Sequence, residues 1–450
     1  MKIRWNLVVV AVIATTLVGG PSSAHHDDDE AQYAGVMSRQ NDTFDAVAAN
    51  AAEHSSAPEG FAPCVNGMAA DTYPCDGIDM MSFVPHAELG TTFVNDIWGW
   101  TDPQTSRDYA LVGASEGTVF VDISDPKRPD VLGILPTQST AGGIFWRDIK
   151  VFSDHAYIVS EHSGHGMQVF DLTQLRDWDG TYTTYAPTTV YTEFGRAHNI
   201  AINTETGFAY AVGAREGNGC GFGLHMIDIN DPASPTFAGC FADHGYIHDT
   251  ECVIYEGPDA AHIGKEICFN SNPTATGVGG PHRVSIVDVT DKSAPVPLSA
   301  EIYANNGYSH QGWLTPDQQF FLHGDELDEV FHGVNTTTRV WDVRDLDDPE
   351  LIGVFANDTT SIDHNLYTEG RVATASNYTS GLRVYDTRNV SAGELSELAF
   401  FDVYPENDNA SFEGGTWSNY PFFRQKKIVA VSSMDRGLFV LRPRIGAVGN

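Results

Sequence analysis

The sequence predicts an all-β protein made of repeated units, and three observations point to it. An apolar strand that ends in Asp recurs along the chain, as in VFVDISDP and LHMIDINDP. Each unit of about 50 residues also holds other short, β-branched runs bounded by Gly, Pro, Asn and Asp, which are typical of strands. Four strands per unit is the pattern of a β-propeller. The recurring residues are Asp122, Asp171, Asp228, Asp288, Asp342 and Asp386.

The repeats predict seven blades between about residues 94 and 441. The last unit ends in GLFVLRPR, lacks a fourth strand and carries Arg442 where the others have Asp. Near Met80, MMSFVPHAELG looks like a fourth strand without the other three. We therefore expect residues 61–445 to form a seven-bladed β-propeller with four-stranded antiparallel blades. The N-terminal strand would close the ring and remove its exposed edges.

The recurring Asp most simply has a structural role. Its short carboxylate can accept hydrogen bonds from nearby backbone N–H groups and so hold the turn that follows the strand. Pro at the next turn position fixes φ, and the chain then reverses into the outer strand.

The first residues resemble an export signal. Lys2 and Arg4 precede a short apolar run, and small residues follow as far as Ala24, so residues 1–24 are predicted to be a signal peptide. Residues 25–60 fit no strand and are predicted to be a flexible, acidic lead-in. We expect a mature chain without a transmembrane segment, either secreted or at the cell surface.

Six cysteines in an exported chain indicate disulfides, for which 15 connectivities exist. Neighbouring pairs close short loops and are favoured, while free buried thiols are the alternative. The favoured pairs are Cys64–Cys75, Cys220–Cys240 and Cys252–Cys268. The net charge of −35 disfavours nucleic acids and anionic membranes as partners.

Two segments, GTVFVDISDPKRPDVLG and GLHMIDINDPASPTFAG, resemble the LVIVD repeat of secreted bacterial and archaeal β-propellers. Blades that open with HNIAI, HDTEC, SHQGW and DHNLY extend the resemblance to the choice-of-anchor B proteins, over roughly residues 60 to 441. This resemblance implies a propeller at the cell surface or in the medium, without a particular reaction. The C-terminal IGAVGN does not resemble an anchor segment, so attachment to a cell wall is not predicted.

One face of the predicted ring collects histidines. In a four-stranded meander, the start of the inner strand and the end of the second strand lie on the same face. His198, His248, His310 and His364 share one position at the start of the inner strands, which line the central channel. We expect them to bind a divalent metal, with Asp249 and Asp363 orienting the rings. Imidazole suits transition metals and carboxylates suit harder cations such as calcium. Alternatively, these polar side chains hydrogen-bond to the backbone at crowded strand starts.

Two functions remain open. The first is a ligand-binding or scaffold protein that uses this His- and Asp-rich face for an unidentified extracellular ligand or protein. The second is a metal-dependent hydrolase or oxidoreductase, with Glu161 or Glu251 as the base. The predicted ligand-contacting residues are Asp96, Arg147, Asp148, His162, Arg215 and Asp325. No nucleophile-elbow, P-loop or dinucleotide motif appears.

Overall fold

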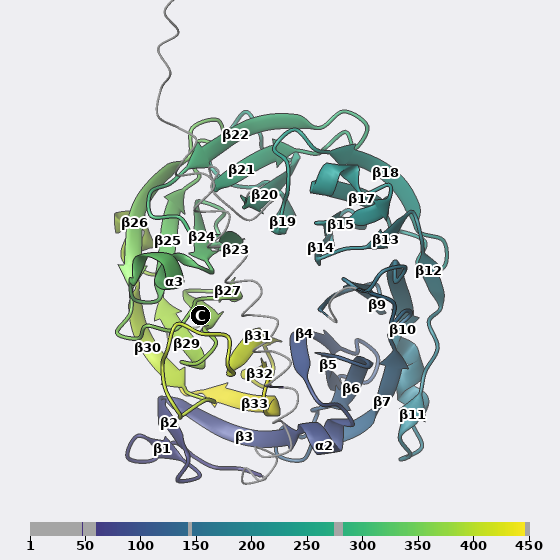
Figure 1. The fold of residues 1–450 in the computed structure, drawn as a ribbon, viewed down its shortest axis with the longest axis vertical. Helices are drawn as coiled ribbons and strands as arrows, with labels where there is room; N and C mark the ends of the chain where they lie inside the picture. The colour runs from purple at the N-terminus through teal and green to yellow at the C-terminus, as the bar shows by residue number, and fades with distance from the viewer. Residues whose placement is uncertain (1–46, 48–59, 143–145, 274–281, 446–450) are drawn as a thin grey trace, which may run out of the picture.

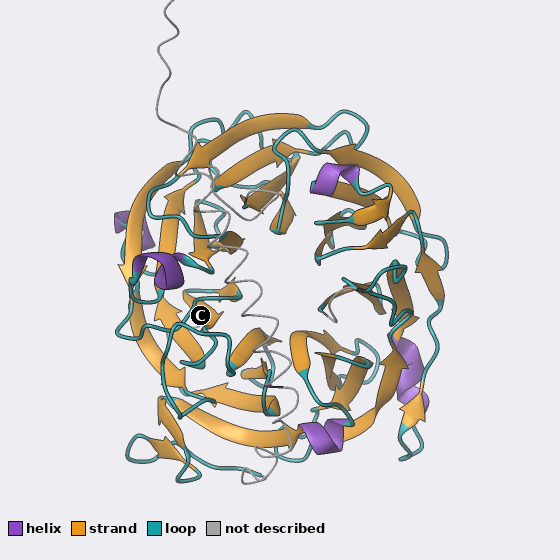
Figure 2. Ribbon diagram, in the orientation of Figure 1, coloured by secondary structure: helices purple, strands orange, loops and turns teal. Residues whose placement is uncertain are grey.

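The computed structural model describes residues 47, 60–142, 146–273 and 282–445. Seven antiparallel sheets stand side by side in a ring around a central axis (Figure 1), and strands make up nearly all of the regular structure (Figure 2). The fold is therefore the predicted all-β, seven-bladed propeller. The predicted signal peptide (1–24) and the lead-in (25–60), apart from residues 47 and 60, lie outside the described residues.

Each sheet runs from an inner strand at the axis to an outer strand at the rim (Figure 1). The first three sheets are β4 (Val94–Thr101), β5 (Asp108–Ala114), β6 (Gly117–Asp122) and β7 (Asp130–Pro136); β8 (Arg147–Phe152), β9 (His155–Ser160), β10 (Met167–Asp171) and β12 (Thr189–Tyr191); and β14 (Asn199–Asn203), β15 (Phe208–Val212), β17 (Leu224–Asp228) and β18 (Thr236–Phe241). The next three are β19 (Asp249–Ile254), β20 (Glu266–Asn272), β21 (Arg283–Asp288) and β22 (Val296–Ile302); β23 (Ser309–Leu314), β24 (Phe320–Asp325), β25 (Thr337–Asp342) and β26 (Glu350–Ala356); and β27 (Leu366–Glu369), β28 (Val372–Ser376), β29 (Leu382–Asp386) and β30 (Ser396–Phe401).

The seventh sheet joins the two ends of the propeller. It consists of β31 (Thr416–Phe423), β32 (Ile428–Ser433), β33 (Gly437–Pro443) and β3 (Ile78–Pro85). Strand β3 pairs antiparallel with β33, from Ile78 opposite Pro443 to Pro85 opposite Gly437. The outer strand of the last blade thus comes from the N-terminal part of the chain, near the segment that the sequence pattern singles out.

Small elements decorate the sheets. The added strands are β1 (Met68–Ala69), β2 (Tyr73–Asp76), β11 (Thr183–Thr184), β13 (Phe194–Arg196) and β16 (Arg215–Gly217). Among the described segments, the helices with defined bounds are α2 (His86–Leu89) and α3 (Asp328–His332), with 3-10 turns at Leu172–Asp177, Cys220–Phe222 and Val390–Ala392. No helix among the described residues is long and apolar enough to cross a membrane.

The hydrophobic core lies between adjacent blades. Val112 and Val121 of the first sheet, for example, share a buried cluster with Ile428, Leu438 and Val440 of the seventh. Full burial of each such side chain contributes about 1.5–3 kcal/mol. Successive side chains of a strand point to opposite faces of the sheet, so each sheet packs one set of side chains against each of its two neighbouring blades.

The recurring Asp has the structural role that its position predicts. In all six repeats, one carboxylate oxygen accepts the backbone N–H of the residue two positions further on, at 2.8 to 3.0 Å. These contacts satisfy a backbone donor where the ladder ends. One oxygen of each of these carboxylates is thus engaged within its own turn.

All six cysteines are in disulfides between neighbours in the sequence, which confirms the favoured connectivity: Cys64–Cys75, Cys220–Cys240 and Cys252–Cys268.

Candidate functional site

Four histidines form a row at one end of the central axis. They come from the starts of four consecutive inner strands, β14, β19, β23 and β27. The ring centroids of His198 and His248 are 4.1 Å apart, those of His248 and His310 are 4.4 Å apart, and those of His310 and His364 are 4.3 Å apart. Because the four histidines occupy the same position in consecutive repeats, each imidazole contacts the next one in the row.

Three of these rings are held through Nδ1. His248 donates from Nδ1 to the backbone oxygen of His310 at 2.9 Å, and His364 donates likewise to the oxygen of Trp417. The Nδ1 atom of His198 lies 2.6 Å from Oε1 of Glu161. A carbonyl oxygen only accepts, so in the neutral rings of His248 and His364 the lone pair is on Nε2. Glu161 and two carbonyls therefore orient the rings, the role expected of Asp249 and Asp363.

Burial keeps most of the row neutral. It lowers the pKa of His248 and His310 well below the usual range and lowers the pKa of His364 to about 3. Burial also opposes protonation of His198, but the Glu161 carboxylate outweighs it and raises the pKa of His198 above its ordinary value. Neutral imidazole is the form that binds a metal ion.

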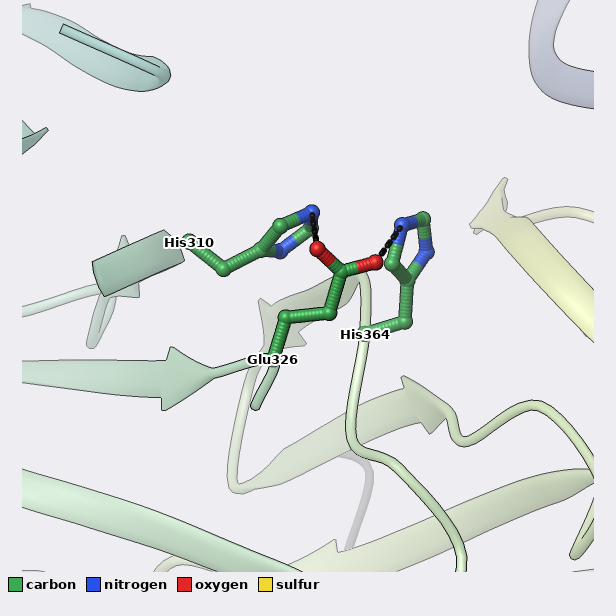
Figure 3. Close-up of side chains that lie close together, drawn as sticks. All are labelled: His310, Glu326 and His364. Carbon is green, nitrogen blue, oxygen red and sulfur yellow. Dashed lines mark ion pairs between the residues drawn. The ribbon is translucent and has the colours of Figure 1, made fainter. Parts of the chain in front are cut away.

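Glu326 brings a carboxylate to the row (Figure 3). Its Oε2 lies 4.0 Å from Nε2 of His310, and its Oε1 lies 3.7 Å from Nε2 of His364. The hydroxyl of Tyr378 donates to Oε1 at 2.8 Å and fixes the carboxylate. Burial raises the pKa of Glu326 to about 7.

The spacing of these three side chains suits a shared ion. Both N···O separations exceed a hydrogen bond. Two ligands of one tetrahedral zinc ion, at bond lengths of about 2.0–2.2 Å, lie about 3.4 Å apart. His310, Glu326 and His364 would reach that separation after small side-chain movements, and they leave further coordination positions open.

Aromatic side chains pack around the histidines at this end of the axis. The ring of His364 contacts Tyr378 and Trp417, with centroids 4.7 and 4.9 Å away, and Trp417 stacks on Trp146 at 4.5 Å. His310 and His364 are only 2% and 3% exposed. An ion here would sit in a largely dehydrated setting, where charged contacts are stronger.

A small cavity adjoins the row. It has a volume of about 20 Å³, enough for a water molecule or an ion, and His198, His310 and His364 line it together with Arg147. Arg147 is 2% exposed, and its Nε donates to the backbone oxygen of Ala114 at 2.7 Å. Its Nη1 and Nη2 find no hydrogen-bond partner among the described residues. A buried guanidinium with free N–H groups is suited to a carboxylate or phosphate.

Acidic residues at the next repeat position have backbone partners. Asp96 accepts the N–H of Ile149 at 3.0 Å, and Asp148 accepts that of Ile200 at 2.7 Å, each from the following blade. Asp148 also lies 2.6 Å from Nζ of Lys150. For these side chains the structure shows the alternative role, in which polar groups hold crowded strand starts.

Three other candidates have different surroundings. Asp325 accepts hydrogen bonds from the hydroxyl of Tyr303 and the backbone N–H groups of Gly307 and Tyr308. His162 is partly buried, and Arg215 lies over the ring of Phe222.

The two base candidates lie in different places. Glu161 contacts the histidine row, whereas Glu251 accepts the N–H of Leu314 and lines a separate cavity of about 230 Å³. Asp249 borders both cavities, and burial, with help from Asp148, raises its pKa to about 7.

Glu326 was not among the residues singled out as ligands from the sequence. It lies in HGDELDEVFHG, after the second strand of the fifth blade and on the same face as the histidines. That placement, rather than any repeat position, was the signal available.

Comparisons with known proteins found one matching family model and several solved structures. Residues 104–137 and 195–243 match the family model of the LVIVD repeat. A structure of hydrazine synthase from Kuenenia stuttgartiensis has a TM-score of 0.53 at 11% identity, over 78% of this chain and 96% of that one. The β-propeller domain of Cps50 (Swd1) from Myceliophteria thermophila has a TM-score of 0.45 at 12% identity, over the same shares. No curated protein is significantly similar in sequence. At such low identity, the likeness to hydrazine synthase shows the fold alone.

Proposed function

We propose that this propeller binds a divalent transition metal through His310, Glu326 and His364, and uses that metal to hold a small anionic ligand. The observation that carries the proposal is the approach of two imidazole Nε2 atoms to the two oxygens of one buried carboxylate, at 4.0 and 3.7 Å. A set of two histidines and one carboxylate is a known arrangement for zinc and for non-haem iron. It leaves positions free for a ligand.

Arg147 supports the choice of an anion. Arg147 lines the same cavity as His310 and His364, and its buried Nη1 and Nη2 have no hydrogen-bond partner among the described residues. An anion bound to the metal could accept hydrogen bonds from both nitrogens. We regard the protein as an exported binding protein of the choice-of-anchor B group; its LVIVD-repeat match and three disulfides support this.

Metal analysis tests the proposal. Protein stripped with a chelator and then dialysed against zinc or cobalt should retain one ion per chain, and bound cobalt(II) should show the visible spectrum of nitrogen and oxygen ligation. The double variant His310→Ala/His364→Ala should retain none. Glu326→Gln, which keeps an oxygen for Tyr378, should bind at least about tenfold more weakly.

The control variant is His332→Ala, because that imidazole is exposed and lies outside the row. It should bind metal like the wild type. Circular dichroism checks that each variant is folded. A folded wild type that retains no metal, or a double variant that retains it fully, would refute the proposal.

A second function, metal-dependent hydrolysis, is favoured by one contact. Glu161 lies 2.6 Å from Nδ1 of His198, which begins the same row and lines the cavity. A histidine paired with a carboxylate beside an open metal position could accept a proton from a metal-bound water. Turnover of ester substrates by the zinc-loaded protein, lost in Glu161→Gln with zinc still bound, would establish it.

A further inference from the structure

A second group of acidic side chains lies apart from the histidine row. Asp328 and Glu329 begin α3 in the fifth blade, and Asp363 lies in the loop before β27 in the sixth. One oxygen of each carboxylate lies within 4.8 Å of the other two. The three residues are 1%, 2% and 3% exposed.

Several oxygens of these carboxylates have no hydrogen-bond donor among the described residues. Neither oxygen of Asp363 has a partner among the described residues, and the same holds for Oδ1 of Asp328 and Oε2 of Glu329. The remaining two oxygens have donors: Oδ2 of Asp328 accepts from Arg339 and from the hydroxyl of Thr337, and Oε1 of Glu329 accepts from the N–H of Thr337. Protein donors thus hold one oxygen of Asp328 and one of Glu329, and the other four oxygens of the cluster accept from no donor among the described residues.

Among the described residues, the charge of this cluster is only partly balanced. Arg339 is the cation paired with this cluster, 2.8 Å from Asp328, and it also interacts with Asp325. Three ionised carboxylates and one guanidinium leave about two negative charges in a buried place. Unpaired buried charge is costly unless it is protonated or bound to a cation.

The backbone makes room for Asp363. A Cβ atom on Gly324 would come within 2.1 Å of Oδ2 of Asp363. Glycine at this position of β24 therefore allows the carboxylate to lie against the strand.

We propose that Asp328, Glu329 and Asp363 bind a hard divalent cation, with calcium as the expected ion. Four free carboxylate oxygens and no nitrogen or sulfur favour calcium, magnesium or manganese over zinc or copper. Magnesium keeps several waters and requires near-octahedral geometry, whereas calcium accepts varied carboxylate arrangements. The cation would join α3 of the fifth blade to the loop of the sixth. This site does not depend on the metal proposed at His310, Glu326 and His364.

Calcium titration of chelator-treated protein tests the site. The wild type should bind one calcium ion by calorimetry, and saturating calcium should raise the melting temperature by about 3 °C or more. Asp363→Asn, which preserves side-chain shape, should lose both responses. Asp358→Asn removes an exposed carboxylate a few residues away and should behave like the wild type.

Two outcomes would overturn the proposal. The first is a folded wild type that shows no calcium binding and no shift in melting temperature; a higher melting temperature for Asp363→Asn without calcium would then indicate that protons neutralise the cluster. The second is an Asp363→Asn variant that keeps the calcium response. His310→Ala/His364→Ala should retain that response, so failure of the transition-metal site can be told apart from failure of this one.

Discussion

At the scale of single residues, carboxylates serve two structural purposes around the ring. The recurring Asp, as in Asp228, accepts an N–H within its own turn. The acidic residues at the inner strand starts, as in Asp148, accept an N–H from the next blade. Each contact satisfies a backbone donor where a regular ladder is interrupted. The inner contacts also fix the relative register of neighbouring sheets.

Glu251 gives a pH-dependent prediction at this scale. Burial, with the nearby Asp249 carboxylate, raises its pKa to about 8, whereas an unfolded Glu titrates near 4.3. A raised pKa in the folded state contributes stability that is complete below the unfolded value and is lost as the pH rises through the folded value. Glu251→Gln is neutral at every pH and still has an oxygen for the N–H of Leu314.

We therefore expect the melting temperature of Glu251→Gln, relative to the wild type, to rise between about pH 5 and pH 8. Thermal unfolding at intervals across this range measures the difference. Glu256→Gln, at an exposed position on the same stretch of chain, is the control. A difference between Glu251→Gln and the wild type that does not change with pH would contradict the assignment.

The spatial proximity of side chains could be predicted from the sequence where they share a repeat position. It could not be predicted for side chains in irregular loops. The four histidines share one repeat position, so their juxtaposition followed from the blade pattern. Glu326 and the cluster of Asp328, Glu329 and Asp363 arise from one irregular loop and its neighbour. Asp363 was expected to orient the histidine rings, but its grouping with Asp328 and Glu329 was not expected. A loop has no periodicity from which to infer side-chain direction, so three-dimensional coordinates were needed.

At the scale of elements, the N-terminal segment bridges two blades. Strand β2 pairs with β30 of the sixth blade, and β3 pairs with β33 of the seventh. The apolar pattern around Met80 predicted a strand here, but β1 and β2 were too short to show any period. The disulfide Cys64–Cys75 closes the loop that contains β1 and the start of β2.

Removal of that disulfide should destabilise the protein. Cys64→Ala/Cys75→Ala frees a loop with a sequence separation of 11, and the chain-entropy model assigns about 2–3 kcal/mol to such a loop. Guanidinium unfolding followed by tryptophan fluorescence measures the loss. Cys252→Ala/Cys268→Ala, with a separation of 16, should lose a similar amount, because the entropy depends only weakly on loop length. Unchanged stability of Cys64→Ala/Cys75→Ala would mean that this disulfide does not constrain the unfolded chain.

At the scale of the whole molecule, the axis is divided along its length. The histidine row and Glu326 occupy one end, and the small cavity with Arg147 and Lys150 adjoins them. The larger cavity, lined by Trp98, Trp313 and Glu251, lies further along the inner strands. A ligand at the histidine end would therefore meet imidazole and guanidinium, whereas one at the other end would meet indole rings and a carboxylate.

The net charge of the whole chain leads to the last prediction. With 60 acidic against 25 basic residues, the folded protein repels itself, and salt screens that repulsion. The screening length falls from about 10 Å at 0.1 M to about 3 Å at 1 M salt. Salt also weakens exposed ion pairs, but each is worth only about 0–1 kcal/mol. Buried pairs such as Arg339–Asp328 are screened less.

The melting temperature should therefore rise as sodium chloride increases from about 0.1 M to about 1 M, and it should rise equally with potassium chloride. A chelator in every sample removes any contribution from calcium. A melting temperature that falls with salt would show that ion pairs stabilise this fold more than its net charge destabilises it.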